Sequence, residues 1–148
     1  MREMVVQRDI AAPRSAVWAV LADFPNIADW NGGVKTSFTT SEATAGVGAK
    51  RHCDLAPLGA LEETIAEWAP EERMVIRIDS AAKLPIKSAL MTCTLDEAQD
   101  STPTRVSYAY TPKFGPLGAL LGPILDRQFT KGFTGFLEDL EKAAVARA

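Results

Sequence analysis

Histidine and cysteine are scarce in this chain, which has one histidine, His52, and two cysteines, Cys53 and Cys93. A metal centre of His and Cys ligands needs more donors than these, so we expect no metal and no other cofactor. His52 and Cys53 are neighbours in an expected strand, where consecutive side chains point to opposite faces, which argues against a Cys–His catalytic pair. Both cysteines are expected to be reduced core thiols, and a disulfide between them is the alternative.

Long apolar runs and blocks of one charge are also missing. The longest apolar stretch, near residues 117–125, is interrupted by Gly and Pro and is shorter than the ~20 residues that a membrane-spanning helix needs. No apolar stretch follows the first charges, so we expect no signal peptide and a cytoplasmic protein. The 16 basic and 19 acidic residues are interspersed, so nothing favours nucleic acid or an anionic membrane as a partner.

What the chain does have is the composition of a globular domain, with 47% hydrophobic and 24% charged residues. Domains typically have ~100–150 residues around one core. We therefore expect a single domain over residues 1–148.

Helical periodicity occurs in two parts of the chain. Val17, Trp18 and Leu21 predict a helix over residues 13–22, which Pro25 separates from a short helical piece at 25–30 and a turn at 31–33. A second stripe predicts an amphipathic helix over residues 123–146, with a short helical turn or loop at 115–122 before it. We place Gly132 on the same face as this stripe, whose members are Leu121, Leu125, Phe129, Phe133, Phe136 and Leu140.

Seven short runs rich in β-branched residues predict strands at 4–10, 34–40, 50–55, 61–68, 73–80, 86–95 and 104–111. Short polar or Gly/Pro connections join the last six, and parallel strands would need crossovers of a dozen or more residues, so these six form an antiparallel meander. The long helix can cover one face of a seven-stranded sheet. The predicted fold class is α+β.

Four stretches resemble a known family in their order and spacing. They are Ile-Ala-Ala-Pro at 10–13 with Val17 and Trp18, Leu-Ala-Asp-Phe at 21–24 with Ala-Asp-Trp at 28–30, Gly-Val-Gly-Ala-Lys-Arg at 46–51, and Lys-Phe-Gly-Pro-Leu-Gly at 113–118, which opens a helix with Gly132. Together they resemble the START-related, birch-pollen-allergen-like superfamily called SRPBCC, and within it bacterial proteins of the polyketide cyclase/dehydrase and lipid-transport type.

The resemblance covers nearly the whole chain and implies a helix-grip fold. In such a fold a seven-stranded curved antiparallel sheet wraps a long C-terminal helix, two short helices follow the first strand, and a cavity lies between sheet and helix. Many relatives carry Glu-Arg on the fourth strand where this chain has Glu63-Thr64, so no role of that Arg carries over.

The inward face of the sheet is the candidate ligand-binding surface. Strand alternation places Met74, Ile76 and Ile78 on one face, as it does Met91 with Cys93 and Tyr108 with Tyr110. We expect a cavity above ~300 Å³, the low end for ligand pockets, and a filled core is the alternative. The candidate ligand-binding residues are Trp30, Arg51, Glu63, Ile76, Ile78, Met91, Cys93, Tyr108, Tyr110, Leu121, Leu125, Phe129 and Phe133.

Arg51 and Glu63 lie opposite each other if Leu55 pairs with Gly59 across a three-residue loop. Pointing inward, the pair could polarise a ligand carbonyl or act as acid and base. Pointing outward, it is an exposed ion pair that contributes ~0.2–1 kcal/mol. Tyr108 could orient a ligand oxygen or donate a proton, so Arg51, Glu63 and Tyr108 are the candidates for catalysis.

Three functions remain open. The large apolar inventory and the lack of a clear catalytic cluster favour binding or transport of a small hydrophobic ligand, such as a lipid, an isoprenoid quinone or a polyketide-like molecule. The alternatives are a polyketide cyclase or dehydratase that uses the same cavity, and a protein-interaction module. A filled core with a large exposed apolar patch would favour the last. The sequence does not indicate the oligomeric state.

Overall fold

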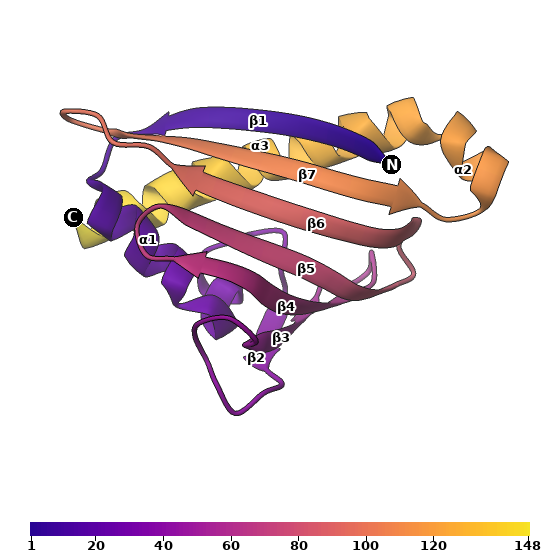
Figure 1. Cartoon of the computed structure of the whole chain (residues 1–148), viewed down its shortest axis with the longest axis horizontal. Helices are drawn as coiled ribbons and strands as arrows, with labels where there is room; N and C mark the ends of the chain where they lie inside the picture. The colour runs from indigo at the N-terminus through magenta and orange to yellow at the C-terminus, as the bar shows by residue number, and fades with distance from the viewer.

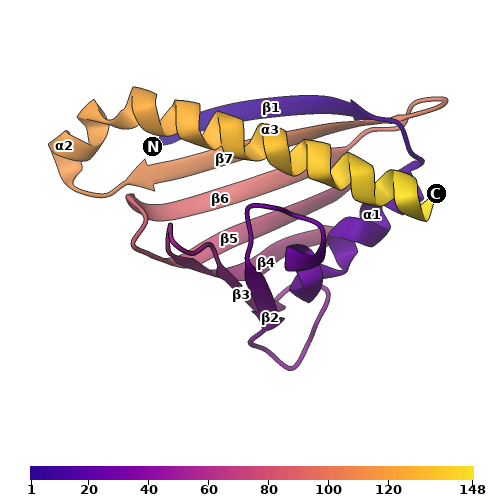
Figure 2. The same cartoon turned by 180° about the vertical axis from the view of Figure 1, so that it is seen from behind.

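A long helix lies across the concave face of a seven-stranded sheet in the computed structural model, which describes residues 1–148 (Figures 1 and 2). Two short helices follow the first strand, and a third short helix precedes the long one. The elements are β1 (Arg2–Ile10), α1 (Arg14–Ala22), the 3₁₀ helix η1 (Phe24–Asp29), β2 (Thr36–Thr39), β3 (Lys50–Asp54), β4 (Ala60–Ala69), β5 (Arg73–Ala82), β6 (Ile86–Leu95), β7 (Thr102–Pro112), α2 (Gly115–Leu120) and α3 (Gly122–Arg147).

The strands follow the order β1-β7-β6-β5-β4-β3-β2, and every neighbouring pair is antiparallel. Strands β2 to β7 form the meander that the sequence predicts, and β1 adds to its far edge beside β7. The predicted α+β class and the predicted seven-stranded antiparallel sheet are therefore confirmed.

The alternation predicted for the strands places the expected residues on the concave face. Cys53, Ile65, Met74, Met91 and Val106 are each at most 5% exposed. Consecutive side chains point to opposite faces of a strand. The neighbours of these residues therefore lie on the convex face, where they contact solvent or side chains of the adjacent strand. This buried face is where the candidate site lies.

Two prolines set the short helices. Pro13 holds the extended backbone from which α1 starts, and Pro25 occupies the first turn of η1, where a missing N–H leaves no hydrogen bond unmade. Trp18 of α1 is 9% exposed and packs edge-on against Trp68 of β4, with the ring centroids 5.1 Å apart. Trp18 is thus a core residue.

The β3–β4 hairpin has the register that the sequence predicts. The backbone N–H of Leu55 donates to the carbonyl of Gly59 at 2.8 Å, and Arg51 lies opposite Glu63. Gly59 has φ +125°, and a Cβ there would lie 2.1 Å from the carbonyl oxygen of Ala82. Only glycine fits this turn, because of both its backbone angle and its close approach to the next hairpin.

The backbone of helix α3 lies close to β1 and α1, and the helix reaches β7 through its side chains. Its C-terminal half is the better buried one, with Phe136, Leu137, Leu140 and Ala144 in the core. No helix of the structure combines the length and the apolar character needed to cross a bilayer.

Two predictions about α3 are wrong. Leu121 is 37% exposed, because the helical run breaks there: it is the C-terminal cap of α2 and not part of α3's periodic stripe. Gly132 is exposed, and a Cβ added to it would meet no atom within 4 Å. At 3.6 residues per turn, Gly132 lies roughly a quarter turn from the centre of the buried stripe, which places it on the exposed flank of α3.

Candidate functional site

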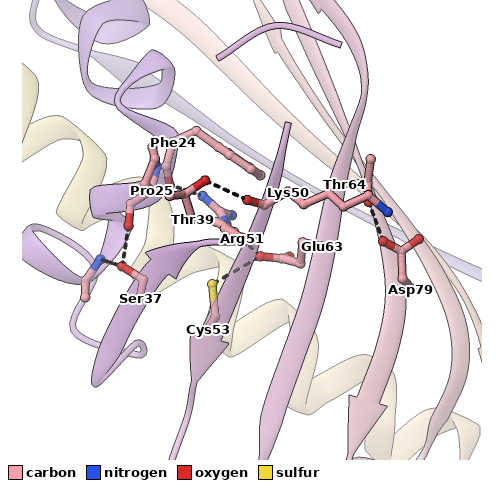
Figure 3. Close-up of polar contacts among 11 residues, drawn as sticks. Phe24, Pro25, Ser37, Thr39, Lys50, Arg51, Cys53, Glu63, Thr64 and Asp79 are labelled. Carbon is pink, nitrogen blue, oxygen red and sulfur yellow. Dashed lines mark hydrogen bonds and ion pairs between the residues drawn. The ribbon is translucent and has the colours of Figure 1, made fainter. Parts of the chain in front are cut away.

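A buried ion pair lies on the concave face of the sheet (Figure 3). Nε of Arg51 donates to Oε1 of Glu63 at 2.8 Å, and the side chains are 5% and 9% exposed. The alternative of an exposed surface pair is therefore excluded. In a low-dielectric interior these two charges must be matched, which explains why they face each other at this register.

Helix η1 covers the pair. Nη1 of Arg51 donates to the carbonyl oxygen of Phe24 at 2.9 Å, and the guanidinium carbon lies 3.9 Å from the centroid of the Phe24 ring. Ser37 of β2 holds η1 in place, since its hydroxyl donates to the carbonyl of Pro25 and accepts from the N–H of Ala28 (Figure 3). Arg51 is thus fixed by β3, β4 and η1 together.

The polar cluster has hydrogen-bonding capacity left over. Oε1 of Glu63 accepts from both Arg51 and the thiol of Cys53, at 2.8 and 3.2 Å. Its other oxygen, Oε2, and Nη2 of Arg51 make no hydrogen bond to the protein. The hydroxyl of Tyr108, a residue only 4% exposed, makes none either, although it is not cut off from solvent as Nε1 of Trp30 is. One acceptor and two donors are therefore unused on this face.

The thiol and the phenol of this face stay protonated near neutral pH. Burial raises the pKa of Cys53, and the negative charge of Glu63 raises it further. Burial also raises the pKa of Tyr108, again with help from Glu63. Cys53 is therefore not an activated nucleophile, and Tyr108 is a hydrogen-bond donor and not a phenolate.

Aromatic rings of α3 pack against the ring of Tyr108. The Tyr108 ring lies 5.0 Å from that of Phe129 and 4.7 Å from that of Phe133, both on α3. These two phenylalanines are only half-buried, whereas Phe136 one turn further is 6% exposed. Rings at such tilted angles pack favourably and close the concave face from the α3 side.

The space enclosed beside this cluster is small. A hollow beside Arg51, Trp30, Ile76 and Phe136 holds about 10 Å³, room for about one water molecule. The cavity above ~300 Å³ that we expected is not found there. A larger hollow of about 310 Å³ lies elsewhere, between the start of α1 and the polar β6–β7 loop at residues 97–101. Side chains thus fill most of the space beside the charged pair.

Trp30 lines the small hollow with a buried donor. Its indole Nε1 is out of reach of solvent and has no hydrogen-bond partner, and its ring packs edge-on against Phe136 at 5.2 Å. Buried N–H groups are nearly always satisfied in folded proteins. This orphan donor lies in the same hollow that Arg51 lines.

The structure brings most of the predicted site residues together. All of the predicted site residues that lie on strands are buried on the concave face, and Leu125 of α3 is buried with them. Leu121 does not belong to the site, as described above. The predicted site residues that are buried in the core are Arg51, Glu63, Ile76, Ile78, Met91, Cys93, Tyr108, Tyr110 and Leu125.

Tyr110 serves a different contact from Tyr108. Its hydroxyl donates to Oδ1 of Asp126 at 2.5 Å, and Arg2 of β1 pairs with the same carboxylate at 2.6 Å. Burial and the bond to Asp126 raise the pKa of Tyr110 to about 12. This network fastens the start of α3 to β1 and β7, which is a structural role.

Two residues that contribute to the site were not predicted. The Phe24 carbonyl and ring carry no sequence signal for binding an arginine. Phe136 was in the predicted stripe but not among the site residues, although it lines the hollow. His52 lies on the outer face, where it stacks on Phe38 and contacts Glu62.

The two cysteines are free, on β3 and β6. Three strand spacings separate β3 from β6, roughly 14 Å, so the alternative of a disulfide is excluded. The structure also brings together no group of three His, Cys, Asp or Glu side chains that could hold a metal ion.

Comparison with known proteins supports the fold and the family. The family model described as polyketide cyclase/dehydrase and lipid transport matches residues 1–145. This chain belongs to that family. A search of curated protein sequences finds no match.

Solved structures resemble this family member over nearly their whole length. The protein TTHA0849 from Thermus thermophilus has a TM-score of 0.83 at 16% identity, with 99% of each chain covered. A START superfamily protein from Mycobacterium smegmatis has a TM-score of 0.82 at 12% identity, also with 99% of each chain covered. The Zhui aromatase/cyclase from a Streptomyces species has a TM-score of 0.80 at 16% identity, covering 99% of this chain and 94% of that one.

At these identities the likeness shows the fold alone. The polyketide cyclase/dehydrase and lipid transport family member described here has the helix-grip fold that its sequence resemblance implies. The seven-stranded curved sheet, the long C-terminal helix and the short helices after β1 all agree with it.

Proposed function

We propose that the chain binds a small, largely apolar ligand that carries one polar group, between the concave face of the sheet and α3. The observation that carries the proposal is the unused hydrogen-bonding capacity of Arg51, Glu63 and Tyr108 on an otherwise apolar, buried face. A few convergent polar groups within an apolar wall are typical of small-molecule sites.

The chemistry of these groups defines the polar end of the ligand. A carbonyl or hydroxyl oxygen can accept from Nη2 of Arg51 or from the Tyr108 hydroxyl, and a ligand hydroxyl can donate to Oε2 of Glu63. A hydrogen bond to a charged group contributes ~1.5–3 kcal/mol net, so a ligand oxygen or hydroxyl that bonds to the Arg51–Glu63 pair gains affinity. Lipids, isoprenoid quinones and polyketide-like molecules combine such an oxygen with an apolar body.

The ligand needs more room than about 10 Å³, so side chains must move to admit it. Phe129, Phe133 and Trp30 are the candidates, because they are only partly buried while the strand residues beneath them are in the core. The two phenylalanines belong to α3, whose backbone lies close to β1 and α1 and which reaches β7 through its side chains. Their displacement therefore need not break the sheet.

The test is native mass spectrometry of protein purified from its own organism, with Tyr108→Phe and Tyr110→Phe as a matched pair. We expect an apolar molecule to co-purify with the wild-type protein. Tyr108→Phe removes one donor to the ligand and should lower its affinity ~2- to 10-fold, while Tyr110→Phe should leave it unchanged. A wild-type protein that carries no such molecule, and binds no lipid or quinone added to it, would contradict the proposal.

A second candidate is a cyclase or dehydratase that uses the same place. The neutral Tyr108 phenol and the Glu63 carboxylate could serve as acid and base toward an enolisable ligand. The Zhui structure is named as an aromatase/cyclase, which fits this candidate. Incubation of the protein with a polyketide-like ketone, followed by chromatography and mass analysis, distinguishes the two: a carrier returns the ketone unchanged, a cyclase returns an isomer of equal mass with a different retention time, and a dehydratase returns a product lighter by one water.

A further inference from the structure

One end of the molecule exposes an apolar surface that the proposed ligand site does not use. Helix α2 protrudes at this end, beside the start of β1 (Figures 1 and 2). Leu120 is 77% exposed, Phe114 66% and Leu117 60%. We call this surface the end patch; its members are Leu58, Phe114, Leu117, Leu120, Leu121 and Ile124.

Backbone contacts join the segments that carry the end patch. The N–H of Lys113 donates to the carbonyl of Pro85, which ties the start of the α2 segment to the β5–β6 turn. Gly59 lies against the carbonyl of Ala82, which ties the β3–β4 turn to the same place. Three separate stretches of the chain thus meet at one end.

The backbone at Phe114 indicates that this surface is not a by-product of folding. Phe114 has φ +70°, in the left-handed region that a bulky side chain rarely adopts. Its side chain is mostly exposed, so burial of the ring offsets little of this strain. Strained backbone that the core does not require is typical of functional segments.

Positive charge accompanies the end patch. Residues 80–88 and 112–131 contain five basic residues and one acidic residue, in a chain whose net charge is −3. The acidic residue, Asp126, is already paired with Arg2. The five basic residues are Lys83, Lys87, Lys113, Arg127 and Lys131. Lys113 is partly buried and the other four are exposed.

We propose that the end patch docks on the surface of a bilayer that contains anionic lipid. Apolar side chains on a protruding helix can enter the boundary between headgroups and acyl chains, and the surrounding lysines and arginine contact lipid phosphates. This docking does not depend on a ligand between the sheet and α3, so it stands or fails separately from the proposed function.

The positive charge around the end patch favours a membrane over a protein as its binding partner. An exposed apolar patch beside a filled core also fits a protein-interaction module. A second copy, however, would bring the same five basic residues against each other in a symmetric dimer, which is unfavourable. An anionic bilayer complements both the apolar centre and the basic margin.

The test is co-sedimentation of the full chain with phosphatidylcholine vesicles, with and without about a third of phosphatidylglycerol. We expect binding to the anionic vesicles only, weakening as salt rises above about 0.1 M, because the Debye length is then below ~10 Å. The double variant Leu120→Ser/Ile124→Ser should lower the partition coefficient at least about tenfold. Arg127→Glu/Lys131→Glu should do the same, since each basic residue contributes roughly fivefold.

Matched controls come from the other end of α3. Val145 is 48% exposed and Lys142 is also exposed, so Val145→Ser and Lys142→Glu make the same chemical changes away from the end patch and should bind vesicles like the wild type. Circular dichroism checks that every variant is folded.

Three outcomes would overturn the proposal. The wild-type protein could fail to sediment with either kind of vesicle. The control variants could lose as much binding as the end-patch variants. Finally, analytical ultracentrifugation could show a dimer that Leu120→Ser/Ile124→Ser converts to a monomer, which would make the end patch a self-interface.

Discussion

Nε of Arg51 lies 2.8 Å from Oε1 of Glu63 across the β3–β4 hairpin, with both side chains less than a tenth exposed. Removing one partner leaves the other charge buried and unmatched. We expect Glu63→Ala or Arg51→Ala to lower the free energy of unfolding by ~3–5 kcal/mol, and the double variant to lower it by less than the sum. Urea unfolding measures all three.

The same hairpin supplies the control for this prediction. Glu62 contacts His52 on the outer face, one position away from Glu63, and its side chain is 43% exposed. Glu62→Ala should change the free energy of unfolding by less than about 1 kcal/mol. Equal losses for Glu62→Ala and Glu63→Ala would show that burial of the Arg51–Glu63 pair has no energetic consequence.

The two tyrosines of the chain should respond oppositely to loss of the hydroxyl. Tyr110→Phe removes a hydrogen bond to the Asp126 carboxylate, so we expect the free energy of unfolding to fall by ~1.5–3 kcal/mol. Tyr108→Phe removes a hydroxyl that has no hydrogen-bond partner in the protein, so stability should stay the same or rise slightly. If thermal unfolding shows Tyr108→Phe as the more damaging variant, the Tyr108 hydroxyl has a partner that these contacts miss.

Two carboxylates should make the free energy of unfolding depend on pH. The guanidinium of Arg2 lowers the pKa of Asp126, and the backbone N–H of Ala11, followed by Arg8, lowers the pKa of Glu141. A carboxyl whose folded pKa is lowered stabilises the fold above its unfolded pKa, about 4, and loses this effect as the pH falls through the folded value.

We therefore expect the free energy of unfolding to decrease as the pH falls below about 4. Asp126→Asn/Glu141→Gln should be less stable than the wild type at pH 7 and should show a shallower decrease. Urea unfolding at several pH values measures both slopes, and parallel slopes for the two proteins would contradict this assignment.

Two glycines should respond oppositely to alanine. Gly132 lies exposed within α3 with open space around it, so Gly132→Ala should raise the free energy of unfolding by ~0.5–1 kcal/mol. Gly59→Ala forces a Cβ against the carbonyl of Ala82 at a positive φ, and should lower it by at least about as much. Urea unfolding of both variants checks this, and destabilisation by Gly132→Ala would place that residue against the sheet after all.

The fold was predictable because its signals are local. Period-2 alternation defines the strands, and the turn that ends at Gly59 sets the register that brings Arg51 opposite Glu63. The direction in which this pair points was not predictable, because both faces of β4 carry carboxylates. It is decided by η1, whose Phe24 carbonyl reaches Arg51 from 27 positions away.

Two other features of the candidate sites depend on three-dimensional packing alone. The volume beside Arg51 depends on how the rings of Trp30 and Phe136 are turned, and sequence periodicity carries no information on rotamers. The basic margin of the end patch is assembled from lysines on the β5–β6 hairpin and around α2 and α3. In the linear sequence these charges are diluted by the acidic residues between them, so no basic block was visible.

Strand β1 pairs along its whole length with β7, the last strand of the sheet. The hydroxyl of Thr102 also reaches back 90 positions to the carbonyl of Ala12. During synthesis β1 therefore leaves the ribosome long before its partner exists, and the aromatic stripe of α3 emerges later still. Stable folding must follow translation of nearly the entire chain, and until then the nascent polypeptide is a natural client for chaperones that hold apolar segments.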